Sequence, residues 1–150
     1  MKKILLLLLT FLTACIVSHA QEWPPAGENI RTRRASSVSP DNCHTEYPRP
    51  QMVRPQWQNL NGLWDYAIRP EDADSMPENA DGQILVPFCV ESSLSGVCKR
   101  ISENEILWYR TSIVRPSKWD GKKILLHFDA VDWRAEVFID GKQIASHTGG

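Results

Sequence analysis

Six short runs rich in β-branched and aromatic residues dominate the sequence after residue 61, and no amphipathic helical stripe separates them. Runs of this length, bounded by Pro, Gly, Asn and Asp, are typical of β-strands. Short strands joined by turn signals predict an antiparallel β-sandwich of the jelly-roll type. We therefore expect an all-β fold. The predicted strands cover residues 62–70, 83–88, 106–114, 122–128, 134–140 and 142–147.

Asp140-Gly141 joins the last two predicted strands and is a strong hairpin signal, because a type I′ turn needs positive φ at both central positions. A complete jelly roll uses about eight strands, which is more than the sequence predicts. The last strand has no partner after it, and Gly149-Gly150 has the composition of a turn leading into further chain. We therefore expect a sandwich that is incomplete on its C-terminal side, with an unpaired edge and an uncovered apolar face.

Residues 21–56 precede the predicted strands and contain six of the ten prolines. Proline fixes its own φ and pushes the preceding residue toward extended backbone, so this segment is predicted to be non-helical. Trp23, Tyr47 and Met52 are larger and more apolar than the residues of a simple linker. We predict an extended Pro-rich arm over 21–56 that lies across another surface. A partial sandwich domain follows over 57–150.

Residues 1–20 have the pattern of a secretory signal peptide. The segment begins with lysines, continues with an apolar stretch over 4–12, and ends in a small-residue cleavage site between Ala20 and Gln21. The apolar stretch is too short to span a bilayer as a stable anchor. In the alternative interpretation "LTAC" is a lipobox, and a lipidated Cys15 would make the chain an outer-membrane lipoprotein. Both interpretations predict export, to the bacterial periplasm or the extracellular space.

The composition excludes several function classes. A net charge of −1 argues against a nucleic-acid surface or a polybasic membrane patch, because both need an excess of Lys and Arg. No Cys or His spacing typical of a zinc site occurs, and we expect neither a metal nor another cofactor. Export makes disulfides feasible. Without Cys15 three cysteines remain, Cys43, Cys89 and Cys98, so at least one thiol stays free within the chain. Cys89 and Cys98 could form a bridge, but we favour two buried small residues.

Three blocks, in this order, resemble glycoside hydrolase family 2, the group of β-galactosidases, β-glucuronidases and β-mannosidases. The blocks are "YPRPQMVRPQWQNLNGLWDYAI" (47–68), "ILVPFCVESSLSGV" (84–97) and "WYRTSIVRPSKWDGKKILLHFDAVDWRAEVFIDGKQIASHTGG" (108–150). The resemblance is to the N-terminal sugar-binding domain of the family, a galactose-binding-like jelly roll. It covers most of the chain after residue 45.

The resemblance implies that an immunoglobulin-like domain and a (β/α)₈ barrel belong to the same polypeptide. Retaining glycosidases need two carboxylates about 5 Å apart, and in this family both are glutamates on the barrel. No residue of this chain matches either glutamate. Glu103 and Glu105 form a tempting pair, but their predicted loop offers no hydrophobic pocket to raise one pKa. We therefore predict no catalytic residue in this chain, which would act as a sugar-binding and scaffold domain.

Two pairs of residues are candidates for contact with a carbohydrate. Glu91 and Ser92 lie in the loop that, in the family, reaches toward the barrel mouth, and they offer hydrogen-bonding groups for sugar hydroxyls. Asp132 and Trp133 combine a carboxylate with an indole face that can stack on a pyranose ring. Structural roles compete with each assignment. Glu91 could pair with Arg110 or cap a turn, Asp132 could sit in a turn, and Trp133 could pack in an interface.

A stand-alone secreted carbohydrate-binding module is the alternative to a domain of a larger enzyme. Jelly rolls serve that role without an attached catalytic domain. The missing strands and the match in the leader, "YPRPQMVRPQW", favour the enzyme domain. The preferred sugar is not specified by these residues, because the family's specificity comes from barrel loops.

Overall fold

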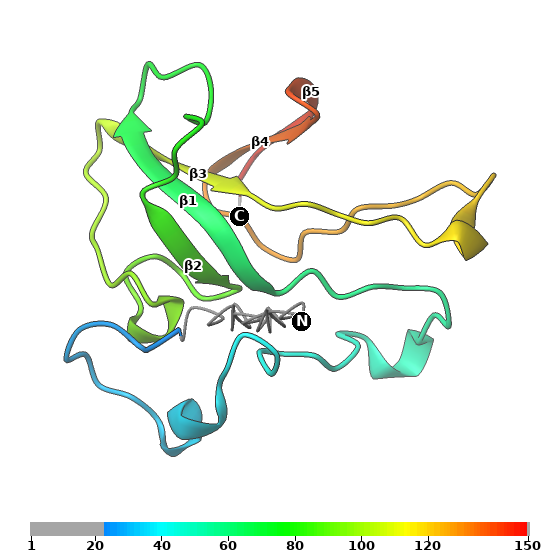
Figure 1. The fold of residues 1–150 in the computed structure, drawn as a ribbon, viewed down its shortest axis with the longest axis horizontal. Helices are drawn as coiled ribbons and strands as arrows, with labels where there is room; N and C mark the ends of the chain where they lie inside the picture. The colour runs from blue at the N-terminus through cyan, green and yellow to red at the C-terminus, as the bar shows by residue number, and fades with distance from the viewer. Residues whose placement is uncertain (1–22, 150) are drawn as a thin grey trace, which may run out of the picture.

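A computed structural model of the chain describes residues 23–149. The predicted signal peptide, its cleavage site between Ala20 and Gln21, and the alternative lipidation site Cys15 lie outside the described residues. In the described part, every regular element is a β-strand or a short 3₁₀ helix, which confirms the predicted all-β class (Figure 1). Between residues 23 and 149 there is no helix long and apolar enough to cross a membrane.

The larger sheet has three antiparallel strands in the order β2-β1-β3. Strand β1 covers Gly62–Pro70, β2 covers Gly82–Val86 and β3 covers Glu105–Arg110. Tyr66 and Ala67 are neighbours in β1, so their side chains point to opposite faces of the sheet, and both are buried. The middle of β1 is therefore covered on both faces, as expected for the central strand.

The core lies between this sheet and the loop that follows β2. Its buried members are Tyr66, Ile84 and Val90, of which Val90 belongs to the loop. Partly buried apolar side chains pack around them: Trp64, Ile68, Val86, Val97, Ile101 and Leu107. Because both the strands and the loop contribute, the loop after β2 is part of the folded core.

A separate two-stranded sheet is formed by β4 (Arg134–Ile139) and β5 (Lys142–Thr148). Asp140 and Gly141 have φ values of 49° and 76°, which confirms the hairpin turn expected at this dipeptide. The hairpin contacts β3 through Phe138, whose ring centroid lies 5.6 Å from that of Trp108. Further strands of a jelly roll stay a prediction.

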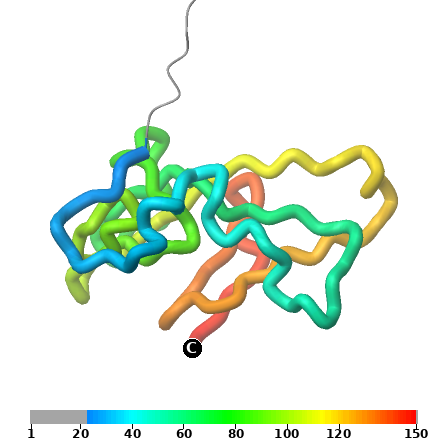
Figure 2. The backbone as a smooth tube through the Cα atoms, turned by 90° about the horizontal axis from the view of Figure 1, so that it is seen from below, coloured from blue at the N-terminus to red at the C-terminus, as the bar shows by residue number. Residues whose placement is uncertain are grey.

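The prediction of a strand over 122–128 is wrong, so the described residues contain five strands instead of six. After β3 the chain leaves the sheet, forms the 3₁₀ helix η4 (Ser117–Trp119) and returns to β4 as irregular backbone (Figures 1 and 2). We call residues 111–133 the excursion. No neighbouring strand pairs with it in the described structure, and a strand needs a partner for its N–H and C=O groups.

The excursion also shortens the strand predicted over 106–114, which ends at Arg110. Apolar side chains of the excursion are solvent-exposed, with exposed fractions of 51% for Ile124, 65% for Leu125 and 51% for Phe128. The alternating pattern of this segment therefore places apolar side chains where the described chain provides no surface that buries them.

The segment before the sheet contains two short 3₁₀ helices, η1 (Arg33–Ser37) and η2 (Pro50–Met52). Its beginning lies against the loop after β2, where the indole N–H of Trp23 donates to the Ser95 carbonyl at 3.4 Å. The backbone N–H of Ala26 donates to the Ser93 carbonyl at 2.9 Å. Figure 2 shows this blue stretch of the chain passing beside the green loop.

Candidate functional site

The first predicted sugar contact, Glu91 with Ser92, lies in the loop between β2 and β3. Ser92 is the N-cap of η3 (Ser93–Ser95), and its hydroxyl accepts a hydrogen bond from the Leu94 N–H at 3.1 Å. Glu91 is exposed, and its backbone carbonyl accepts from the side-chain amide of Asn29 at 3.2 Å. Ser92 therefore has a structural role. The Glu91 carboxylate forms no ion pair within residues 23–149.

Arg110, the alternative partner of Glu91, pairs with another carboxylate. Its guanidinium lies 3.1 Å from the Asp65 carboxylate on the adjacent strand, and it also donates to the Pro77 and Glu78 carbonyls. The sheet register explains the pairing, because Asp65 and Arg110 are directly opposite each other.

A buried serine holds the Glu91 loop in shape. The Ser95 hydroxyl lies 2.7 Å from the Ser92 carbonyl and accepts from the Val97 N–H at 3.0 Å. Ser95 is fully buried, so these bonds form away from competing water. The loop therefore presents Glu91 from a preformed backbone.

Tyr109 on β3 is a polar neighbour of this loop that was not among the predicted contacts. Partial burial raises the pKa of Tyr109 to about 12, with smaller contributions from the neighbouring Cys89 and Glu91, although 39% of the residue is still exposed. The phenol is therefore neutral at physiological pH and can donate a hydrogen bond, while Glu91 can accept one. A sugar hydroxyl needs both kinds of partner. The alternating sequence pattern does not reveal that Glu91 and Tyr109 are neighbours, because they are 18 residues apart in the sequence.

The second predicted contact, Asp132 with Trp133, lies at the end of the excursion. Both residues are exposed, and the Trp133 side chain is 65% exposed. The Trp133 carbonyl accepts from the Gly149 N–H at 2.8 Å, which ties this point to the end of β5. Because most of the Trp133 side chain is exposed, its indole is available for stacking. No hydrogen bond or ion pair in the described structure joins this pair to Glu91 and Ser92.

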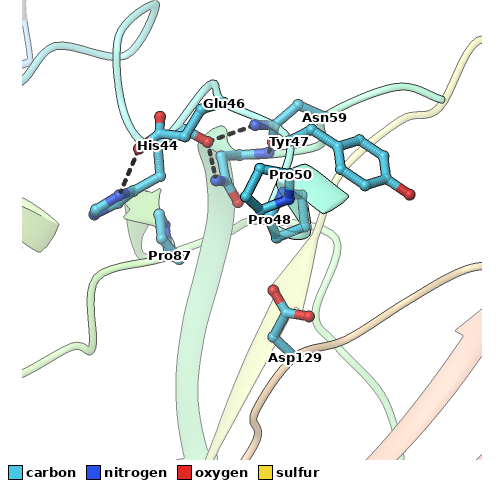
Figure 3. A pocket seen from close by; sticks show the side chains of 9 residues that line it. His44, Glu46, Tyr47, Pro48, Pro50, Asn59, Pro87 and Asp129 are labelled. Atoms are coloured by element: carbon cyan, nitrogen blue, oxygen red, sulfur yellow. Dashed lines mark hydrogen bonds and ion pairs between the residues drawn. The ribbon is translucent and has the colours of Figure 1, made fainter. Parts of the chain in front are cut away.

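A third polar site is an open pocket of about 570 Å³ that the sequence did not predict. Figure 3 shows the Asp129 carboxylate on one side, directed toward the proline rings on the other. The polar groups come from separate stretches of the chain, so no compact motif marks the site. The lining residues are His44, Glu46, Tyr47, Pro48, Pro50, Asn59, Asn61, Pro87 and Asp129.

Two asparagine side chains fix the upper wall of this pocket. The amides of Asn59 and Asn61 both donate to the His44 carbonyl, at 2.6 Å and 3.1 Å. The Asn59 side-chain oxygen accepts from the Asn61 N–H at 2.7 Å. These bonds hold His44 in a left-handed conformation with φ of 51°.

The shifted carboxyl groups do not have the properties of a general acid. The Ser102 N–H and the Ser102 hydroxyl lower the pKa of Glu105, to which they donate at 2.9 Å and 2.8 Å. The Ile68 N–H and the Arg69 guanidinium likewise lower the pKa of Asp81. A glycosidase acid needs a raised pKa to be protonated at neutral pH. Glu103 is exposed in the turn before β3, whereas Glu105 is the first residue of that strand, so the expected loop position is wrong for Glu105.

The three described cysteines are unbridged. Cys43 is buried and Cys98 partly buried, but Cys89 is exposed, so the expectation that Cys89 is a buried small residue is wrong. Its place in the loop after β2 explains the exposure, because the loop buries Val90 in the core instead. In the described part of the chain, no group of three or more His, Cys, Asp or Glu residues could hold a metal ion.

Comparison with known proteins finds a similarity to a glycosidase. No protein-family model matches the chain. A β-glucuronidase of Paenibacillus borealis is 22% identical over 109 residues. The match covers 69% of this chain and 18% of that protein, so the chain spans less than a fifth of the length of this relative. The similarity supports a relation of the chain to glycoside hydrolases.

Proposed function

We propose that this chain is an exported, non-catalytic sugar-binding and scaffold domain of a family 2 glycoside hydrolase. The similarity to a β-glucuronidase carries the proposal, because it extends over 109 residues of an all-β chain. The match involves 18% of the relative, which is the share expected for one domain of a multidomain enzyme.

The carboxyl groups support a non-catalytic role. Retaining hydrolysis needs a protonated acid and an ionised nucleophile about 5 Å apart. Hydrogen bonds lower the pKa values of Asp81 and Glu105, which favours the ionised form of both. Catalysis would therefore depend on glutamates of a barrel in the same polypeptide.

Sugar contacts would come from two exposed sites. Glu91 can accept a hydrogen bond from a sugar hydroxyl, and the neutral phenol of Tyr109 can donate one. Trp133 can stack on a pyranose ring, and Asp132 beside it can accept from hydroxyls. The partners would be a β-glycoside or a polysaccharide side chain, together with the immunoglobulin-like and barrel domains.

The proposal divides the chain into three parts. A signal peptide over 1–20 directs export to the periplasm or the extracellular space, with lipidation at Cys15 as the alternative. The arm over 21–56 braces the sheet. A partial jelly roll over 57–150 would be completed by further strands of the enzyme.

Hydrolysis of nitrophenyl β-glycosides tests the proposal. We expect the purified chain to release nitrophenol from the β-galactoside, β-glucuronide and β-mannoside no faster than buffer, while a β-glucuronidase run in parallel cleaves its own substrate. Turnover well above the blank would overturn the non-catalytic assignment. The coding sequence beyond codon 150 separates the two binding roles. An open frame of barrel size supports the enzyme domain, and a stop codon after a well-folded product supports a stand-alone module.

A further inference from the structure

The pocket shown in Figure 3 is separate from the two predicted sugar contacts. None of Glu91, Ser92, Asp132 and Trp133 lines it. Its volume of about 570 Å³ lies within the range of small-molecule sites, roughly 300–1,000 Å³. The pocket therefore has room for a ligand of its own.

The apolar part of the pocket is built from proline rings. Pro48 and Pro50 come from the arm, and Pro87 follows β2. Proline side chains lose little conformational entropy when a ligand packs against them, because the ring is already fixed. They offer a rigid surface for the C–H groups of a saturated ring.

The polar part of the pocket is rich in hydrogen-bond acceptors. The Asp129 carboxylate faces the proline rings from the excursion (Figure 3), and Glu46 stands at the rim with its side chain 78% exposed. Carboxylates accept hydrogen bonds and cannot donate when ionised. The two carboxylates therefore favour a ligand that supplies donors, and hydroxyl groups do so without adding charge.

The charge of the pocket limits its ligand further. Neither Lys nor Arg lines it, so nothing compensates the two carboxylates except His44, whose ring lies 3.9 Å from Glu46. A sugar that carries a carboxylate, such as a uronic acid, would meet like charge. No metal-binding cluster exists among residues 23–149, so a cation bridging ligand and protein is not supported either.

We propose that this pocket binds a neutral pyranoside, with Asp129 accepting hydrogen bonds from the sugar hydroxyls and the proline rings packing against the sugar face. The choice of a sugar as the ligand rests on the proposed function. The preference for a neutral over an anionic sugar rests on the charges that line the pocket. The site would give the chain a third carbohydrate contact, lined by neither Glu91 nor Trp133.

Ligand-observed saturation-transfer NMR on the full secreted chain tests this site. The probes are methyl β-galactopyranoside, methyl β-glucopyranoside and glucuronate. We expect a neutral pyranoside to bind at least about tenfold more tightly than glucuronate, and Asp129→Asn to weaken its binding by about tenfold. The same substitution should reduce the difference in affinity between the neutral sugar and glucuronate, because it removes one of the charges that repel glucuronate.

Asp72→Asn is the matched control, because it makes the same chemical change at an exposed position outside the pocket. It should leave binding of both sugars unchanged, and circular dichroism should show all variants folded alike. Tighter binding of glucuronate, or no binding of any probe to the folded chain, would overturn the inference. Sugar binding that Asp129→Asn does not alter would overturn the pocket assignment while leaving the proposed function intact.

Discussion

At the scale of single residues, Asp81 illustrates how one carboxylate ties a loop to the sheet. It lies directly before β2, and it accepts hydrogen bonds from the Ile68 N–H at 2.9 Å and from the Arg69 guanidinium at 2.8 Å. These bonds are made to the ionised carboxylate and lower its pKa in the folded state. Stability gained from Asp81 is therefore present above the ordinary pKa of aspartate, about 3.9, and is lost as pH falls toward the lowered folded value.

We predict that Asp81→Asn lowers the free energy of unfolding by about 1 kcal/mol at pH 7. Urea unfolding at pH 7 and at pH 3, with dilute protein, measures the effect. The difference between the two proteins should shrink at pH 3, because protonation weakens the same bonds in the parent chain. Asp72→Asn serves as the control and should unfold like the parent chain. An equal or larger difference at pH 3 would contradict this role of Asp81.

At the scale of elements, Gly96 connects η3 to the start of the arm. Its φ of 81° is the left-handed conformation of a helix C-cap. A Cβ at this position would lie 2.5 Å from Nε1 and 2.9 Å from Cδ1 of Trp23. Any larger residue would therefore push the Trp23 indole away from the loop.

We predict that Gly96→Ala frees the start of the arm and accelerates trypsin cleavage after Arg31, Arg33 and Arg34, several-fold relative to the parent chain. Proteolysis of a native protein follows local opening, which the lost contact would favour. Gly121→Ala is the control. It has the same backbone cost at φ of 74°, but a Cβ there meets no atom within 4 Å. Equal cleavage rates for the two variants would show that the Trp23 contact does not hold the arm.

Local sequence patterns predicted correctly those elements that depend on neighbouring residues. Strand β1 has the bounds expected from its alternation and its closing proline, and the Asp140-Gly141 turn forms because both residues adopt positive φ. The segment 122–128 has an equally good alternating pattern but no strand. Alternation describes which side chains can share a face, whereas pairing depends on a partner that is distant in sequence.

The same limit applies to the sites. Glu91 and Trp133 are exposed, so both side chains are accessible to a ligand. The pocket around Asp129 could not be predicted, because its lining residues are spread from His44 to Asp129 and only the path of the excursion brings them together.

At the scale of the whole molecule, the excursion exposes an unusual amount of apolar surface. Large apolar side chains are exposed by 39–79% along it: Ile113, Val114, Ile124, Leu125, Leu126, Phe128, Val131 and Trp133. Large apolar side chains exposed to this extent mark contact sites or aggregation-prone regions. We call these eight residues the apolar strip.

We predict that the chain by itself self-associates through the apolar strip. The double variant Ile124→Lys/Leu125→Lys should shift sedimentation toward monomer and reduce binding of an apolar dye, because charge opposes burial of the strip. Val53→Lys is the control, since Val53 is 59% exposed but lies in the arm. A monomeric parent chain with a sharp, concentration-independent melting transition would contradict the prediction.

We expect this chain to bind a sugar without breaking a glycosidic bond. A proton NMR time course of the purified chain with a nitrophenyl β-galactoside tests both parts in one sample. We expect saturation transfer from protein to sugar, together with an anomeric signal of the intact glycoside that stays constant over a day. Growth of the free-sugar anomeric signals above a protein-free sample would contradict it.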